Sequence, residues 1–214
     1  DATKSVIWDN ATATGGVPAW IFRDAQIGDM VVGSSRTVYL RTAAATAIRS
    51  VIANIPNSTK YTMYIDGTAT FELRASRVRG GRAIQRTGAK ITALHCDWSE
   101  YATTGLSIDS TATVAPLIGN CVFAGSDQNP IVDSSPTVTL DATNCYGNVF
   151  VLPAPAGTPD PILPAAGPLE RDPDTLEPFA WSHLCGLAAP AGVQWDYYGK
   201  PMRAKPAIGA VEVQ

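Results

Sequence analysis

The residues best suited to chemistry lie in one short stretch, Asp97-Trp-Ser-Glu-Tyr101. Two carboxylates beside two aromatic side chains suit the stacking of a sugar ring and the binding of its hydroxyls. Hydrolysis or elimination on a polysaccharide would use Asp97 and Glu100 as its acids. Glu72, Arg77 and Arg79 complete this candidate glycan-binding set if they lie one repeat away. The alternative is structural, with a solvent-facing turn and Trp98 in the core.

Four cysteines, Cys96, Cys121, Cys145 and Cys185, offer metal or disulfide chemistry. Their spacings of 25, 24 and 40 residues contain no CxxC pair, and the two histidines, His95 and His183, are far apart. Zinc sites need close ligand pairs, so we expect no metal and no other cofactor. The nearly equal spacing of the first three instead predicts a buried column of reduced thiols. His95 beside this column is expected to be a polar wall residue.

Composition excludes several other functions. A net charge of −3 argues against nucleic acid as a partner, because nucleic-acid binding needs a basic surface. No apolar run reaches the roughly 18 residues of a membrane span, so no membrane insertion is expected. The chain begins at Asp1 without a signal-like segment, which is expected of a processed product or a piece of something longer.

An internal repeat predicts the elements that position these residues. Four segments align without gaps and start at Gly33, Asp66, Asp109 and Asp133, and a weaker copy starts at Arg86. The four copies share a small or acidic residue, two small residues, a Thr and an apolar residue. Such units read as short strands joined by turns, and they bury their apolar residues only by stacking on one another about 4.8 Å apart.

The repeat makes specific predictions about the interior. The apolar positions Val38, Phe71, Ile91, Val114 and Val138 are predicted to form one column. The aspartates Asp66, Asp109 and Asp133 precede small turn residues and are predicted to bond the turn backbone, although an acidic column is also tempting as a site. The Ala-rich stretch 43–56 has Ile48, Val51, Ile52 and Ile55 at helical spacing, so it is interpreted as an inserted helix or a long loop.

These patterns predict an all-β chain, a right-handed parallel β-helix over residues 1–148. An irregular segment over residues 149–214 holds most of the sixteen prolines, which cannot donate to strand ladders. This Pro-rich segment is expected to cap the solenoid, as repeat proteins require. The alternative fold is a β-sandwich whose Ser/Thr-rich turns coincide by chance.

Three phrases carry a family resemblance: Ser182-His-Leu-Cys-Gly186, Asp196-Tyr-Tyr-Gly-Lys-Pro201 and Ala207-Ile-Gly-Ala-Val-Glu212. They resemble the closing motif of pectate-lyase-like right-handed β-helix proteins, and Ile7-Trp-Asp-Asn10 resembles a phrase of their coils. His183, Met202 and Ala207 stand where that pattern has Pro, Arg and Asp. The resemblance implies a function within the range of this family, which includes polysaccharide lyases, glycoside hydrolases, phage tail spikes and fibres, and surface adhesins.

Short loops between coils favour a structural or receptor- and glycan-binding module over an enzyme. The expected setting is a virion fibre, a spike or another extracellular appendage, assembled as a homotrimer or with other virion or appendage proteins. The expected partner is a cell-surface polysaccharide. The alternative is a lyase or glycoside hydrolase acting on a surface polysaccharide.

Overall fold

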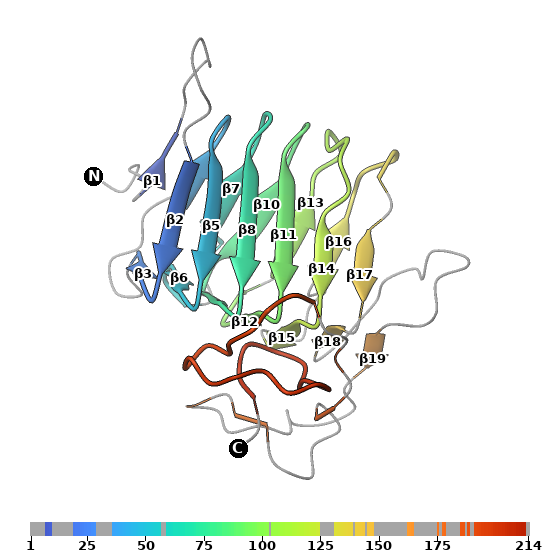
Figure 1. The fold of residues 1–214 in the computed structure, drawn as a ribbon. Coiled ribbons are helices and arrows are strands. Elements are labelled where there is room, and N and C mark those ends of the chain that lie inside the picture. Colours follow the sequence, from blue (N-terminus) through green and yellow to red (C-terminus); the bar gives the residue numbers. More distant parts are fainter. Residues whose placement is uncertain are drawn as a thin grey trace.

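The computed structural model shows a parallel β-solenoid, in which each turn of the chain, here called a coil, adds one strand to each of three sheets (Figure 1). It describes residues 7–9, 19–28, 36–56, 59–102, 104–124, 131–138, 140–143, 145–147, 162–164, 175, 177–178, 185–186, 188 and 191–212. No helix occurs in these residues, so the all-β prediction is confirmed. The right-handed sense of winding stays a prediction.

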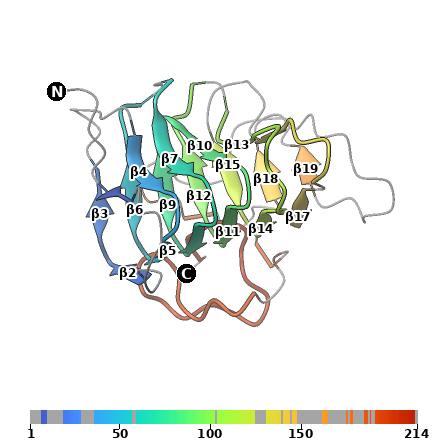
Figure 2. The ribbon, with the colours of Figure 1, turned by 90° about the horizontal axis from the view of Figure 1, so that it is seen from above.

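The three sheets contain six, six and seven strands. Sheet A consists of β1 (Ile7–Trp8), β4 (Arg36–Leu40), β7 (Tyr61–Ile65), β10 (Arg82–Gln85), β13 (Leu106–Ile108) and β16 (Ile131–Asp133). Sheet B consists of β2 (Ala19–Arg23), β5 (Ala44–Ile48), β8 (Thr70–Arg74), β11 (Lys90–Leu94), β14 (Leu117–Gly119) and β17 (Asp141–Thr143). Sheet C consists of β3 (Gln26–Ile27), β6 (Val51–Ala53), β9 (Arg77–Arg79), β12 (Asp97–Ser99), β15 (Val122–Ala124), β18 (Cys145–Gly147) and β19 (Ile162–Pro164). Figure 2 shows β4, β7, β10 and β13 side by side.

Alternation of side chains explains why the strands stack. In β8 and β11 every second residue is buried, including Phe71 and Ile91, which are register partners. Successive side chains of a strand point to opposite faces, so each coil contributes one row to a shared core. The predicted stack of Phe71 on Ile91 is therefore confirmed.

The bend from sheet B to sheet C is built by two stacked rows. Asp24, Arg49, Ala75, His95 and Asn120 all adopt a positive φ between 44° and 54°, which turns the chain sharply. In four of these five bends the next residue has a side chain that donates to the carbonyl two residues earlier: Ser50, Ser76, Cys96 and Cys121. Those bonds satisfy backbone carbonyls inside the bend.

The cysteine column is confirmed. Cys96, Cys121 and Cys145 are free and buried, and the pairing of Asp97 with Val122 places Cys96 beside Cys121. Beside them His95 is buried, and its Nε2 lies 3.0 Å from Nδ2 of Asn120.

The helix interpretation of 43–56 is wrong, because these residues contain β5 and β6. Ala45, Ala47 and Ile52 point into the core, while the positive φ of Arg49 changes the strand direction between them. The apolar residues of this stretch fall at helical spacing because two strands, β5 and β6, are joined by such a bend. The first two repeat copies start at Gly33 and Asp66, yet the first coil is not longer than the others, since Leu40 pairs with Ile65, 25 residues later.

The first repeat copy therefore does not stack on the second copy. Val38 lies in sheet A opposite Met63, whereas Phe71 lies in sheet B opposite Ala45. Val114 is half-buried in a bend outside the strands, so the five-residue column is wrong at Val38 and Val114. Val138 packs partly buried against the core.

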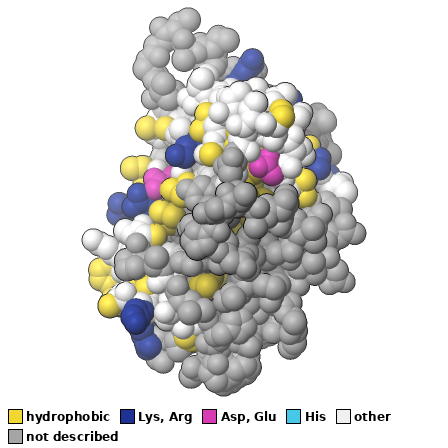
Figure 3. Space-filling view, turned by 90° about the vertical axis from the view of Figure 1, so that its right-hand side faces the viewer, with side chains coloured by type: hydrophobic (Ala, Val, Ile, Leu, Met, Phe, Trp, Pro, Cys, Tyr) yellow, Lys and Arg dark blue, Asp and Glu magenta, His cyan; other side chains and the backbone are white. Residues whose placement is uncertain are grey.

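Of the described part of the C-terminal segment, residues 191–212 lie along sheet C (red in Figure 1). Regular stacking continues further than predicted, because β19 (Ile162–Pro164) lies in this segment and pairs with β18 at the end of sheet C. Val122 of β15 packs in one apolar cluster with Ala188 and Ile208, and Gly209 donates its N–H to the carbonyl of Asn120. The predicted boundary between residues 148 and 149 lies outside the described residues. Figure 3 faces the end of the solenoid near β16 to β19, and among the described residues in that view charged side chains are scattered without a patch of one sign.

Candidate functional site

The aromatic members of the candidate glycan-binding set lie in the core. Trp98 and Tyr101 are each 1% exposed, and the Trp98 ring stacks on Phe123 with centroids 4.8 Å apart. A ring enclosed in this way has no face left for a sugar. The structural alternative was right about Trp98 but not about a solvent-facing turn, because residues 97–99 form strand β12 and Tyr101 is buried as well.

The two candidate acids of this stretch are engaged in structural contacts. Asp97 is buried, and its Oδ2 accepts a 2.8 Å hydrogen bond from the backbone N–H of Ala210. Glu100 forms a 2.5 Å ion pair with Arg79 across neighbouring coils. Asp97 therefore holds the C-terminal segment and does not line an open cleft.

The other predicted site residues are divided between two sheets. Glu72 lies in β8 of sheet B, where it forms a 2.7 Å ion pair with Arg74. Arg77 and Arg79 lie in β9 of sheet C, and the Arg77 guanidinium carbon lies 5.4 Å from the ring centroid of Tyr197. The structure thus brings Arg77, Arg79, Asp97 and Glu100 together but leaves Glu72 apart.

Two of the phrases that resemble β-helix proteins, Asp196–Pro201 and Ala207–Glu212, are joined to each other by hydrogen bonds. Asp196 is buried and accepts hydrogen bonds from the N–H groups of Lys200 and Glu212, at 2.7 and 3.2 Å. Glu212 in turn accepts a 2.8 Å bond from the N–H of Ala207. These bonds close the Asp196 to Glu212 stretch on itself and present Ala210 to Asp97.

Sequence reasoning missed a cluster of tyrosines and arginines on sheet A. It comprises Arg36, Tyr39, Tyr61, Tyr64, Arg82 and Arg86, and is called here the tyrosine–arginine face. Arg36, Tyr61 and Arg82 share one register position on three consecutive coils, and Tyr39 pairs with Tyr64. Correct alignment of the first coil would have revealed this recurrence, because it places Arg36 opposite Tyr61.

The tyrosine–arginine face is held by ring and guanidinium contacts. The Arg36 guanidinium lies over Tyr39 and Tyr64, 4.9 and 4.2 Å from their centroids. Arg82 lies 4.4 Å from the Tyr61 centroid and donates to its hydroxyl at 2.5 Å. Cations over ring faces and edge-to-face ring pairs such as Tyr61 on Tyr64 fix these side chains in place.

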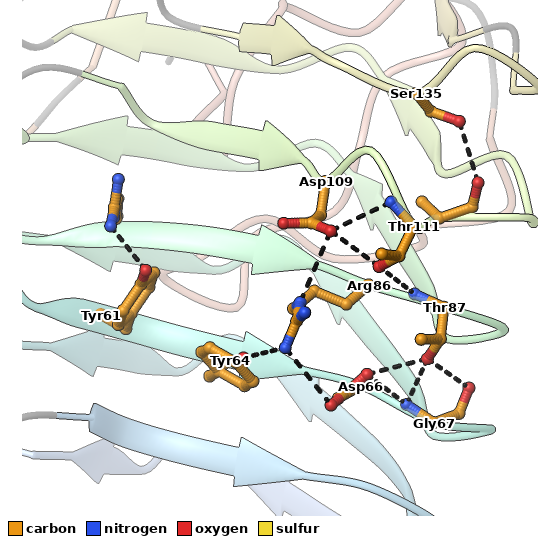
Figure 4. A network of polar contacts seen from close by, with 11 residues as sticks. Tyr61, Tyr64, Asp66, Gly67, Arg86, Thr87, Asp109, Thr111 and Ser135 are labelled. Atoms are coloured by element: carbon orange, nitrogen blue, oxygen red, sulfur yellow. Dashed lines mark hydrogen bonds and ion pairs between the residues drawn. The ribbon is translucent and has the colours of Figure 1, made fainter.

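At the edge of this face, Arg86 links two coils (Figure 4). It donates to the hydroxyl of Tyr64 and lies 3.8 and 3.6 Å from carboxylate oxygens of Asp66 and Asp109. Burial opposes the charge of Arg86, but the Tyr64 hydroxyl and the two carboxylates outweigh it, so the pKa of Arg86 is raised. Arg86 thereby neutralises the acidic column at this point.

The aspartates themselves bond the turns, as predicted. Gly67, Thr111 and Ser135 donate their N–H groups to the carboxylates of Asp66, Asp109 and Asp133, at 2.8, 3.0 and 2.9 Å. The hydroxyl and N–H of Thr111 lower the pKa of Asp109. These carboxylates therefore accept hydrogen bonds from the backbone of the turns.

The tyrosine–arginine face offers ring and guanidinium contacts to a ligand. The half-buried Tyr61 and Tyr64 can pack against the C–H face of a sugar, and Arg82 can donate to hydroxyl or carboxylate oxygens. In the described residues no group of three or more His, Cys, Asp or Glu side chains could hold a metal ion. The same part of the chain contains no helix long and apolar enough to cross a membrane.

Comparisons with known proteins found no similar protein. No family model, no curated protein and no solved structure matches the chain.

Proposed function

We propose that this chain is a glycan-binding β-solenoid module whose tyrosine–arginine face contacts a cell-surface polysaccharide. The observation that carries the proposal is the recurrence of Arg36, Tyr61 and Arg82 at one register position of sheet A. Successive coils repeat at the strand spacing of about 4.8 Å, so such a row offers evenly spaced contacts to an extended chain. A polysaccharide is a repeating ligand of this kind.

Electrostatics supports the same ligand class. Three arginines give the face cationic donors, and the half-buried rings of Tyr61 and Tyr64 give it flat apolar surfaces, while Asp66 and Asp109 lie within ion-pair distance of Arg86. Arginine binds carboxylates and hydroxyls through a fixed fork, and tyrosine packs against sugar rings. Rigid side chains lose little rotamer entropy on binding, and the ring contacts already immobilise Tyr61 and Tyr64.

The proposed setting is a virion fibre, a spike or another extracellular appendage, and the proposed assembly is a homotrimer. This setting is supported by the resemblance of the Asp196–Pro201 and Ala207–Glu212 phrases to β-helix proteins of such structures. The outer side of sheet B carries Ile21, which is 67% exposed, and is one surface at which copies can pack. Light scattering of the purified chain is expected to give three times the monomer mass; a monomer at high concentration would contradict the trimer.

Binding is tested by titrating the chain with acidic and neutral bacterial polysaccharides. Tyr61→Ala and Arg82→Ala are each expected to weaken binding about tenfold, the equivalent of about 1.4 kcal/mol. Lys205→Ala, which removes an exposed cation of the C-terminal segment, is the matched control and is expected to bind as the unaltered chain does.

Two results would reject the proposal. If binding is unaffected by Tyr61→Ala and Arg82→Ala, the tyrosine–arginine face is not the site. If the chain releases oligosaccharides from these polymers, and Asp97→Asn or Glu100→Gln abolishes the release, the chain is an enzyme instead.

A further inference from the structure

A groove lies between the bend of the first coils and the C-terminal segment, away from sheet A. Its volume is about 480 Å³, within the range of about 300–1,000 Å³ of small-ligand sites, and it opens to solvent. One wall is formed by Asp24, Gln26, Arg49 and Val51, and the other by Tyr197 and Tyr198. It is called here the Tyr198 groove.

We propose that the Tyr198 groove is a second binding site, which takes a single neutral sugar residue. This inference goes beyond the proposed function, because it uses other residues on another side of the solenoid. It gives the C-terminal segment a role in recognition as well as in covering sheet C.

The aromatic wall is rigid and accessible at the same time. Tyr198 is 48% exposed, yet its hydroxyl donates to the carbonyl of Thr175 at 3.1 Å. Its ring meets Tyr197 edge to face with centroids 5.1 Å apart, and Tyr197 lies against Arg77. A fixed, half-exposed ring is a ready platform for the C–H face of a sugar.

The polar wall offers hydrogen bonds without net charge. Arg49 donates two hydrogen bonds to Asp24, at 2.8 and 2.7 Å, and the two side chains remain 25% and 60% exposed. Each charge is compensated, so an ionic ligand gains little, whereas hydroxyl groups can donate to Asp24 and accept from Arg49. The exposed amide of Gln26, whose Nε2 donates a 3.5 Å hydrogen bond to the carbonyl of Gly28, adds a donor and an acceptor.

Arg49 of one wall lies close to the segment that forms the other wall. A Cβ built at Gly199 would lie 3.8 Å from Nη1 of Arg49, which places the guanidinium against the segment that carries Tyr198. The hydrogen bond from the N–H of Ala210 to Asp97 fixes that segment on sheet C. The groove is therefore preformed, and sugar binding does not first require ordering of its walls.

The test uses saturation-transfer NMR on the full chain with methyl pyranosides of glucose, galactose and mannose, and with galacturonic acid as the charged probe. At least one neutral glycoside is expected to receive saturation on its ring C–H protons. Tyr198→Ala is expected to weaken that binding about tenfold, and Gln26→Ala about threefold.

Two controls separate this groove from other aromatic surfaces. Trp195→Ala removes another exposed ring, 47% exposed on the same segment and not a groove residue, and is expected to change nothing. Tyr61→Ala tests the tyrosine–arginine face and is also expected to leave monosaccharide binding intact.

The inference is overturned if no neutral glycoside receives saturation, if saturation persists in Tyr198→Ala, or if galacturonic acid is preferred. None of these outcomes bears on polysaccharide binding by sheet A, so the two proposals fail separately.

Discussion

The carboxylate of Asp97 in β12 accepts a 2.8 Å hydrogen bond from the backbone N–H of Ala210, 113 residues further along the chain. Gly209 beside it has a φ of 110°, and a Cβ there would lie 3.3 Å from Oδ1 of Asp97. Only glycine readily combines that backbone conformation with so close an approach. The pair therefore anchors the C-terminal segment on the middle of the solenoid.

Removing this anchor should cost stability. Asp97→Ala leaves the buried N–H of Ala210 without its acceptor, and is expected to lower the free energy of unfolding by about 2–3 kcal/mol in denaturant titration. Glu100→Ala breaks only a partly exposed ion pair with Arg79 and should cost about 1 kcal/mol or less. Equal losses for the two variants would show that Asp97 does not anchor the segment.

The pH dependence of stability should depend on Glu212. Burial raises the pKa of Glu212, outweighing the hydrogen bond from Ala207 and the charge of Arg203, which lower it. A raised pKa means that this group favours the folded state below its usual pKa of 4.5, and that its contribution is lost as the pH rises through the raised value. Glu212→Gln keeps an acceptor for Ala207 and should flatten this decline in unfolding free energy measured from pH 4 to 7.

Asp109→Asn provides the opposite control for that measurement. Because Thr111 lowers the pKa of Asp109, the carboxylate stabilises the fold above the usual value of 3.8. That contribution is lost as the pH falls through the lowered pKa. Its replacement should change the profile on the acidic side and leave the decline attributed to Glu212 in place; the reverse pattern would contradict both assignments.

The cysteine column should be reduced and unreactive in the folded chain. Burial raises the pKa of Cys121 well above its usual value, and the neighbouring thiols of Cys145 and Cys96 raise it further. The three thiols of the column should react with a thiol reagent only after unfolding, without prior reduction. A disulfide between any two of them would contradict the column.

Serine should replace a cysteine of this column at little cost. Cys96→Ser places a hydroxyl where Ser76 in the neighbouring coil already donates to a carbonyl two residues earlier. We expect a loss of about 1 kcal/mol or less in unfolding free energy, and a larger loss for Cys96→Val, which cannot donate. If valine is tolerated better than serine, the bond to Leu94 does not matter for stability.

Substitution by aspartate should prevent folding at a buried position of the repeat but not at a half-buried one. Ile91 is fully buried opposite Phe71, so Ile91→Asp is expected to prevent folding, at a cost of several kcal/mol. Val114 is half-buried in a bend, so Val114→Asp should still give a cooperative thermal transition at a lower temperature. Loss of folding in Val114→Asp would place that residue in the core after all.

The sequence by itself determined the stacked coils, several of the side chains in their core and the residues that form their turns. The stacking of Phe71 on Ile91, the cysteine column and the turn role of Asp66 and Asp109 could all be predicted, because each depends on alternation and on a repeat of near-constant length. Where the pattern was ambiguous, prediction failed. The alanines of β5 fit a strand and a helix equally well, and only the partners Ala19 and Thr70 of Ala44 select the strand.

Tertiary structure alone decided which outward side chains meet. Outward residues carry no repeat signal, since solvent tolerates many types, so Arg36 and Tyr61 become neighbours only through the register between β4 and β7. The partner of Asp97 was hidden for a related reason. A contact across 113 residues depends on where a segment without a repeat docks, and that is set by the shape of sheet C and the hydrogen bonds it offers, not by any local pattern.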